Sequence, residues 1–91
     1  MKFIGIKIKG IVQGVNFRYS TFIEATALGL KGRVQNVHTD TVYIIAQGSE
    51  TSLKILIEWC LDGPQEAFIN SLEINEIHSD SYSDFAILRP S

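Results

Sequence analysis

The residues best suited to chemistry lie together in one short segment, from Gly10 to Arg18. Two glycines there, Gly10 and Gly14, permit a turn that opens a helix, and the first backbone N–H groups of a helix have no partner within it. Such N–H groups, with the helix dipole behind them, form a binding site for an anion. Arg18 falls near the expected helix start, where its planar guanidinium can bind two phosphate oxygens at once. The segment therefore predicts a site for a small phosphorylated or carboxylated ligand, unless the glycines serve only the turn and Arg18 is solvated.

Three other side chains invite a chemical role but fit structural roles better. Cys60 lies on the apolar stripe of an expected helix, which is typical of a buried structural thiol rather than a nucleophile. His38 follows a strand and would share a face with Asn36 only if that strand continued, so we expect it to lie in a turn instead. His78 borders a polar turn and is expected to be solvated.

Hydrophobic periodicity assigns the elements that must position the Gly10–Arg18 segment. Residues 3–9 alternate between apolar and polar, which predicts a half-buried strand. From about Tyr19 to Leu30 the apolar residues have helical spacing, which predicts a buried stripe of Tyr19, Phe22/Ile23, Ala27 and Leu30. The later elements are strands at 34–37 and 41–47, a helix from Glu50 capped by Ser49, a bulged strand within 67–77 and a short strand at 85–88. This β-α-β-β-α-β order plus a short strand predicts a ferredoxin-like α+β sandwich, with two helices on one face of an antiparallel sheet.

Composition narrows the classes of function. The chain has 91 residues, 45% of them hydrophobic, and a net charge of −2. Its length predicts a single domain, residues 1–91, and its charge argues against a broad nucleic-acid-binding face. No apolar run is long enough to span a membrane, and a single cysteine excludes an internal disulfide. We therefore expect a cytoplasmic monomer that binds neither nucleic acid nor membrane.

Charge is unevenly distributed along the chain. Residues 1–23 contain Lys2, Lys7, Lys9 and Arg18 and no acid, a local charge of +4, whereas the other 68 residues carry −6. This asymmetry predicts that positive charge gathers on the strand and loop of the expected anion site.

The segment from Gly10 to Arg18 resembles the acylphosphatase signature G-x-V-Q-G-V-x-F-R and fits every fixed position. Leu28 to Asn36 is similar to the family's second block, L-G-L-x-G-W-V-x-N. Further on, Gly63-Pro64 followed by Ala67 and Ile69 resembles the family's G-P-x-x-A-x-V segment. The resemblance covers essentially the whole chain.

This resemblance implies a function and a set of site residues. In the family, the loop matching Gln13, Gly14, Val15, Asn16, Phe17 and Arg18 surrounds a phosphate with backbone amides. The arginine matching Arg18 binds the phosphate oxygens, and the asparagine matching Asn36 orients the attacking water. The implied reaction is hydrolysis of a small acyl phosphate to a carboxylate and inorganic phosphate, without metal, other cofactor or covalent intermediate. A phosphate or sulfate ion is expected to be able to occupy the same site.

Two departures from the family pattern bear on the site. Arg33 stands where the second block usually has tryptophan, which either alters the packing of the strand that carries Asn36 or leaves Arg33 on an exposed face. In the following turn, Thr39-Asp40 replaces the frequent Asp-Gly, so we expect Asp40 to adopt the left-handed conformation that glycine adopts more easily.

Two other classes of function stay open at this point. RNA-recognition domains share the β-α-β-β-α-β order, but they need exposed aromatic residues and a basic sheet face. Tyr43 satisfies the first need, whereas the first strand offers glycine and lysines where stacking rings are expected. The second class is a regulatory domain that binds an anion without turnover, against which the presence of both Arg18 and Asn36 argues.

Overall fold

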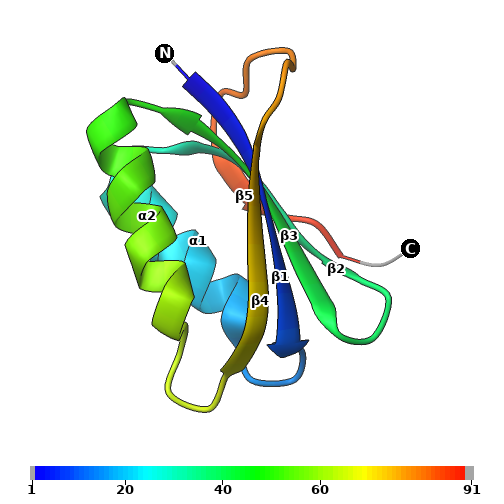
Figure 1. The fold of residues 1–91 in the computed structure, drawn as a ribbon. Helices are drawn as coiled ribbons and strands as arrows, with labels where there is room; N and C mark the ends of the chain where they lie inside the picture. Colours follow the sequence, from blue (N-terminus) through cyan, green and yellow to red (C-terminus); the bar gives the residue numbers. More distant parts are fainter. Residues whose placement is uncertain (1, 90–91) are drawn as a thin grey trace.

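A computed structural model of the chain describes residues 2–89. Its elements are β1 (Lys2–Ile11), α1 (Phe17–Ala27), β2 (Lys31–Val37), β3 (Thr41–Gly48), α2 (Glu50–Asp62), β4 (Phe68–Glu76) and β5 (Phe85–Ile87). Figure 1 shows both helices on the same side of the sheet. The predicted ferredoxin-like order, with its short additional strand, is confirmed.

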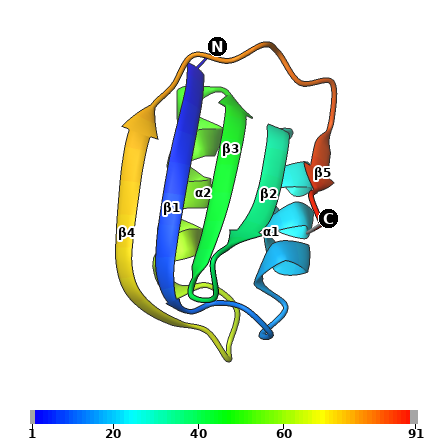
Figure 2. The same ribbon diagram turned by 90° about the vertical axis from the view of Figure 1, so that its right-hand side faces the viewer.

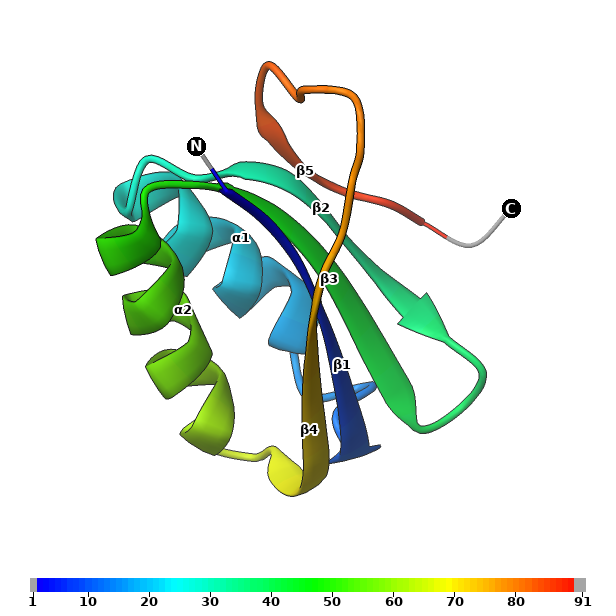
Figure 3. The same cartoon turned by 45° about the horizontal axis from the view of Figure 1, so that its top comes forward.

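The sheet is mixed rather than wholly antiparallel. Its strand order is β4-β1-β3-β2-β5, and Figure 2 looks onto the face opposite the helices. The first four strands pair antiparallel, whereas β5 pairs parallel to β2. The predicted antiparallel sheet of the first four strands is confirmed, and the short additional strand joins it in the parallel direction. The segment after β4 carries the chain from one edge of the sheet to the other, so β5 arrives in the direction of β2 (Figure 3).

The core lies between the sheet and the two helices. Alternate residues of the central strands β1 and β3 face the helices and are almost fully buried: Ile4, Ile6, Ile8, Val42, Ile44 and Ala46. Leu53, Leu56 and Cys60 of α2 are buried with them. Alternation thus divides every central strand into a helix-facing side and an outer side.

The buried stripe of α1 matches the predicted one only in part, because Phe22 packs against the core and Leu30 is buried but the other members differ. Tyr19 and Ile23 remain 53% and 49% exposed, and the buried residues of the helix are Phe17, Thr21 and Ala25. The helix begins two residues earlier than expected, so the i, i+4, i+8 set from Phe17 faces the sheet. Thr21 is tolerated there because its hydroxyl donates a hydrogen bond of 2.8 Å to the Phe17 carbonyl.

The predicted bulge in the fourth strand is present. The register between β1 and β4 shifts after Lys9, which pairs with Ser71, because the next residue, Gly10, pairs with Ile69. Asn70 is therefore the extra residue on β4. The bulge lies at the end of β1 from which the loop to α1 departs.

Candidate active site

The loop between β1 and α1 has the alternating backbone that forms an anion-binding concavity. Gly14 and Asn16 have φ values of 76° and 66°, and the residues beside them have no positive φ. Successive N–H groups converge in such an alternating conformation. Glycine and asparagine are the residues that enter the left-handed region at least cost. The local sequence therefore favours this loop shape.

The N-terminus of α1 is not capped by a side chain. Asn16 occupies the N-cap position with left-handed backbone angles, and its side chain makes no cap hydrogen bond. Within residues 2–89, no backbone N–H from Gln13 to Arg18 donates to a protein acceptor. The first turn also contains no acid, so the positive end of the helix dipole remains available to an anion.

The Gln13 side chain connects this loop to the turn between β2 and β3. Its amide nitrogen donates to the carbonyls of Thr41 at 2.9 Å and His38 at 3.0 Å, and lies 3.4 Å from that of Val37. The backbone N–H of Gly10 adds a bond of 3.0 Å to the Asp40 carbonyl. The loop is thereby held against the end of the strand that carries Asn36.

Asn36 reaches the same pocket from β2. It shares the helix-facing side of the strand with Val34, which is fully buried, and pairs with buried Val42 on β3. Its Oδ1 is buried and has no hydrogen-bond partner within the described part of the chain. A buried amide oxygen without a partner is costly, unless a ligand or water supplies the missing donor.

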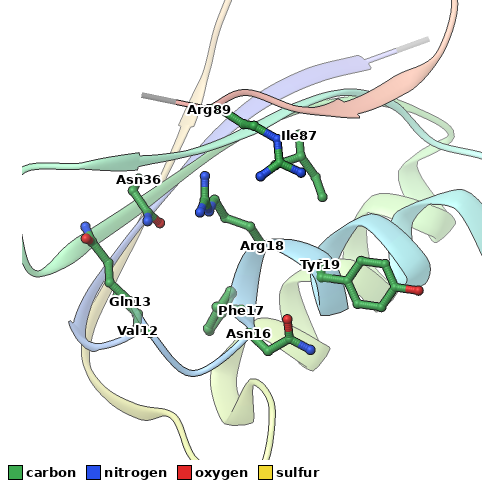
Figure 4. A pocket seen from close by; sticks show the side chains of 10 residues that line it. Val12, Gln13, Asn16, Phe17, Arg18, Tyr19, Asn36, Ile87 and Arg89 are labelled. Carbon is green, nitrogen blue, oxygen red and sulfur yellow. The ribbon is translucent and has the colours of Figure 1, made fainter. Parts of the chain in front are cut away.

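Arg18 lies between the loop and the edge of the sheet. Its guanidinium donates one hydrogen bond, of 3.2 Å, to the carbonyl of Leu88, and forms no ion pair with any residue in the described part of the chain. Figure 4 shows the guanidinium directed into the pocket beside Asn36. A cation without a carboxylate partner retains its capacity to bind an anion.

These groups surround a pocket of about 540 Å³. It is lined by Val12, Gln13, Gly14, Asn16, Phe17, Arg18, Tyr19, Asn36, Ile87 and Arg89. Of the residues predicted for the site, only Val15 does not line the pocket; it packs against the core. The sequence reasoning missed Tyr19, Ile87 and Arg89. Only the parallel pairing of β5 with β2 brings Ile87 and Arg89 here, and alternation within 85–88 gives no sign of that neighbour.

The prediction that the positive charges of residues 1–23 gather around the loop is wrong for most of those residues. Lys2 forms ion pairs with Glu50 and Glu76 away from the pocket, and the hydrogen bond that its ammonium donates to Glu76 is the main cause that raises the pKa of Lys2. Lys7 lies on the outer side of the sheet because its neighbours Ile6 and Ile8 face the helices. Of the cations in residues 1–23, only Arg18 lines the pocket, and Arg89 supplies the second charge.

The other candidate residues have structural positions. Cys60 is buried as predicted, and burial, with a smaller contribution from Glu24, raises the pKa of its thiol to about 12. The thiol is therefore protonated at neutral pH and is a poor nucleophile. His38 lies in the turn and His78 is exposed, both as predicted.

The residue in the left-handed conformation of the β2–β3 turn is not Asp40. His38 adopts it, with a φ of 57°, and Asp40 has no positive φ. The position that requires left-handed angles thus comes immediately after β2, two residues before the expected one.

Arg33 lies on the outer face of the sheet, where it is half-buried. It lies on the side of β2 opposite Asn36, with its Nη1 2.9 Å from Oδ1 of Asp84 and its guanidinium carbon 4.8 Å from the centre of the Tyr82 ring. A cation–π contact and an ion pair hold it over the outer side of the edge strands. The replacement of the family tryptophan therefore leaves the helix-facing side, where Asn36 lies, unchanged.

The fold and the pocket together define a small ferredoxin-like α+β domain whose first loop has anion-binding geometry. No helix in residues 2–89 is long and apolar enough to cross a membrane. Within the same residues, no three His, Cys, Asp or Glu side chains gather in a way that could hold a metal ion.

Comparison with known proteins identifies the family. The acylphosphatase family model matches residues 4–87, and the chain belongs to the acylphosphatase family of hydrolases. The chain is 42% identical over 88 residues to the acylphosphatase of Shewanella amazonensis, covering 96% of this chain and 97% of that one. Two solved acylphosphatase structures are similar to it. That from Coxiella burnetii has a TM-score of 0.92 and 37% identity and covers 96% of this chain and 92% of its own. That from Bacillus subtilis also has a TM-score of 0.92, with 31% identity, covering 97% and 99%.

Proposed function

We propose that this chain hydrolyses the carboxyl-phosphate bond of small acyl phosphates, with the phosphate held by residues 13–18 and the water oriented by Asn36. One observation carries the proposal: donors and an acceptor with unused hydrogen-bonding capacity meet in a single pocket. The loop amides have no protein acceptor, the Arg18 guanidinium has one hydrogen bond to a carbonyl and no ion pair, and the buried Oδ1 of Asn36 has no donor. An anion and a water molecule are the two ligands that these groups require.

The phosphate is bound by the backbone of the loop and by Arg18. Backbone amides of Gln13 through Arg18 donate to its oxygens, so Val15 contributes through its N–H while its side chain packs inward. The guanidinium donates to two oxygens at once and balances the charge that spreads over them in the transition state. Because these groups are fixed before the substrate arrives, little reorganisation opposes the reaction. Free phosphate or sulfate binds the same groups.

The attacking water is held by the amide of Asn36. Its Oδ1 accepts one hydrogen of the water and directs a lone pair of the water oxygen toward phosphorus. Gln13 contributes indirectly by fixing the loop against the turn that follows Asn36. This places the nucleophile and the phosphate in one rigid frame.

The chemical step needs positioning and charge stabilisation more than a strong base. A bond forms from the water oxygen to phosphorus, and the bond from phosphorus to the acyl oxygen breaks. The carboxylate leaves with that electron pair, and the proton of the water passes to a phosphate oxygen. A carboxylate is a good leaving group, so no acid is needed to protonate it. All of the groups that this mechanism uses belong to one chain, so we infer that a monomer without a cofactor is sufficient.

Hydrolysis of benzoyl phosphate, followed by ultraviolet absorbance without added metal and repeated with EDTA, tests the proposal. We expect turnover well above the spontaneous rate, unchanged by EDTA. Hydrolysis at only the spontaneous rate would contradict the proposed activity.

The Asn36→Ala variant tests the assigned role of the asparagine. It should lower kcat about 30- to 1,000-fold, the effect of losing one contact of about 2–4 kcal/mol in the transition state. Inorganic phosphate should still raise its melting temperature as in the wild type, because the phosphate donors remain. A kcat near the wild-type value would remove Asn36 from the mechanism.

A further inference from the structure

Arg89 is a second cation of the pocket, and phosphate binding as described above makes no use of it. It lies two residues beyond β5, is exposed, and lines the pocket together with Ile87. Within residues 2–89 it forms no ion pair or hydrogen bond with the protein. The pocket lining contains no acidic residue that would neutralise it. A guanidinium in this position is available to an anionic ligand.

The sheet register fixes which part of the site Arg89 faces. Val34 pairs with Ile87 in the last rung of the parallel β2–β5 ladder, and two residues farther along each chain segment Asn36 and Arg89 both line the pocket. In Figure 4, Asn36 and Arg89 lie on opposite sides of the Arg18 guanidinium. The cation therefore stands across the proposed phosphate position from the asparagine.

In-line displacement relates this position to the substrate. The attacking water and the leaving group lie on opposite sides of phosphorus. A water held by Asn36 directs the acyl group away from Asn36, toward the side on which Arg89 lies. The cation is exposed at the mouth of the pocket rather than beside the loop amides, so it meets the acyl end of the substrate and not the phosphate.

We propose that Arg89 selects acyl phosphates whose acyl part carries a second negative charge. This inference rests on the proposed function, and it names the substrate class of the same site. Electrostatic attraction to an exposed guanidinium acts mainly on binding, so the effect should appear in KM more than in kcat. A carboxylate carried across an aromatic ring points away from the phosphate, so such a substrate probes for a cation on the acyl side of the site.

Two substrates that differ only in that charge test the inference: benzoyl phosphate and 4-carboxybenzoyl phosphate. Arg89→Gln should lower kcat/KM for the carboxylated substrate about 5- to 30-fold, mainly through KM, because one charge-assisted contact is lost. For benzoyl phosphate the change should stay within about twofold, because no charge on its acyl part meets the side chain. Lys54→Gln is the matched control, since it removes one charge from an exposed position on α2.

The outcomes separate this inference from the proposed function. Equal losses on both substrates would place Arg89 on the shared phosphate end and overturn the inference, as would no loss on either. An equal response to Lys54→Gln would reduce the effect to net charge and overturn it too. Wild-type turnover of benzoyl phosphate reports on the proposed function alone, whatever Arg89→Gln does.

Discussion

The two helices begin in opposite ways. At the start of α2, Ser49 has extended backbone angles, and its hydroxyl accepts a hydrogen bond of 3.1 Å from the Ser52 N–H. Glu50 adds a carboxylate in the first turn, where the helix dipole favours it. At the start of α1, Asn16 has left-handed angles and makes no cap bond, and no acid follows it. The N-terminus of α2 is thus stabilised by a side-chain cap and an acid, whereas the N-terminus of α1 has neither and lies beside an arginine.

This difference shows where the domain gives up stability for binding. A side-chain cap contributes about 1 kcal/mol, so the open start of α1 forgoes stabilisation that the neighbouring helix obtains. The uncapped N–H groups instead face a pocket that is lined by Arg18 and by no acidic residue. An anion in that pocket supplies what Ser49 and Glu50 supply to α2, and its binding energy is then available for catalysis.

Removing Arg18, beside the uncapped N-terminus of α1, should produce the largest effect on kcat/KM. Arg18→Ala should lower kcat/KM for benzoyl phosphate about 30- to 1,000-fold, because a charge-assisted contact worth about 2–4 kcal/mol in the transition state is lost. Arg18→Lys should recover only part of the rate, since an ammonium does not bind two oxygens in a fixed plane. We also expect that phosphate no longer raises the melting temperature of Arg18→Ala. A rate close to wild type in that variant would contradict the assigned role.

Adding a carboxylate to the uncapped N-terminus of α1 should produce the next largest effect on kcat/KM. Tyr19 lies in the first turn of α1, lines the pocket and is 53% exposed, so a polar side chain is tolerated there. Tyr19→Glu should stabilise the helix start and lower kcat/KM about 5- to 100-fold. The physical reason is repulsion of about 1–3 kcal/mol between the carboxylate and the substrate phosphate at an effective dielectric near 20.

Tyr19→Gln is the control for that substitution, since it removes the same ring and its stacking on Phe22 without adding charge. The ratio of kcat/KM between the two variants isolates the charge. A ratio near one, measured at low ionic strength, would show that the start of α1 does not bind the phosphate.

The sequence predicts the loop and the uncapped N-terminus of α1 better than it predicts the rest of the pocket. The loop is local: glycine, asparagine and arginine within nine residues determine its backbone and its charge. The sequence pattern places the buried stripe of α1 only partly correctly, because Phe17 belongs by its spacing to the loop although the helix begins there. Arg89 could not be assigned because its place depends on a parallel pairing between β2 and β5, which are far apart along the chain. The strand alternation that correctly predicts burial of Ile6 and Ile8 also puts Lys7 on the far side of the sheet. The net charge of residues 1–23 carries no information about which side each lysine occupies.

Removing the side-chain cap of α2 should produce the smallest effect on catalysis. Ser49→Ala removes the cap of α2 and should lower the free energy of unfolding by about 1 kcal/mol, a decrease of about 4–8 °C in melting temperature for a domain of this size. Ser49→Gly should lose only a few tenths of a kcal/mol, because glycine is itself tolerated at an N-cap. Both variants should keep the wild-type kcat/KM and the wild-type increase in melting temperature with phosphate, since α2 does not line the pocket. Loss of phosphate binding in Ser49→Ala would mean that the two helix starts are energetically coupled, and the separation between a stabilising start and a binding start would not hold.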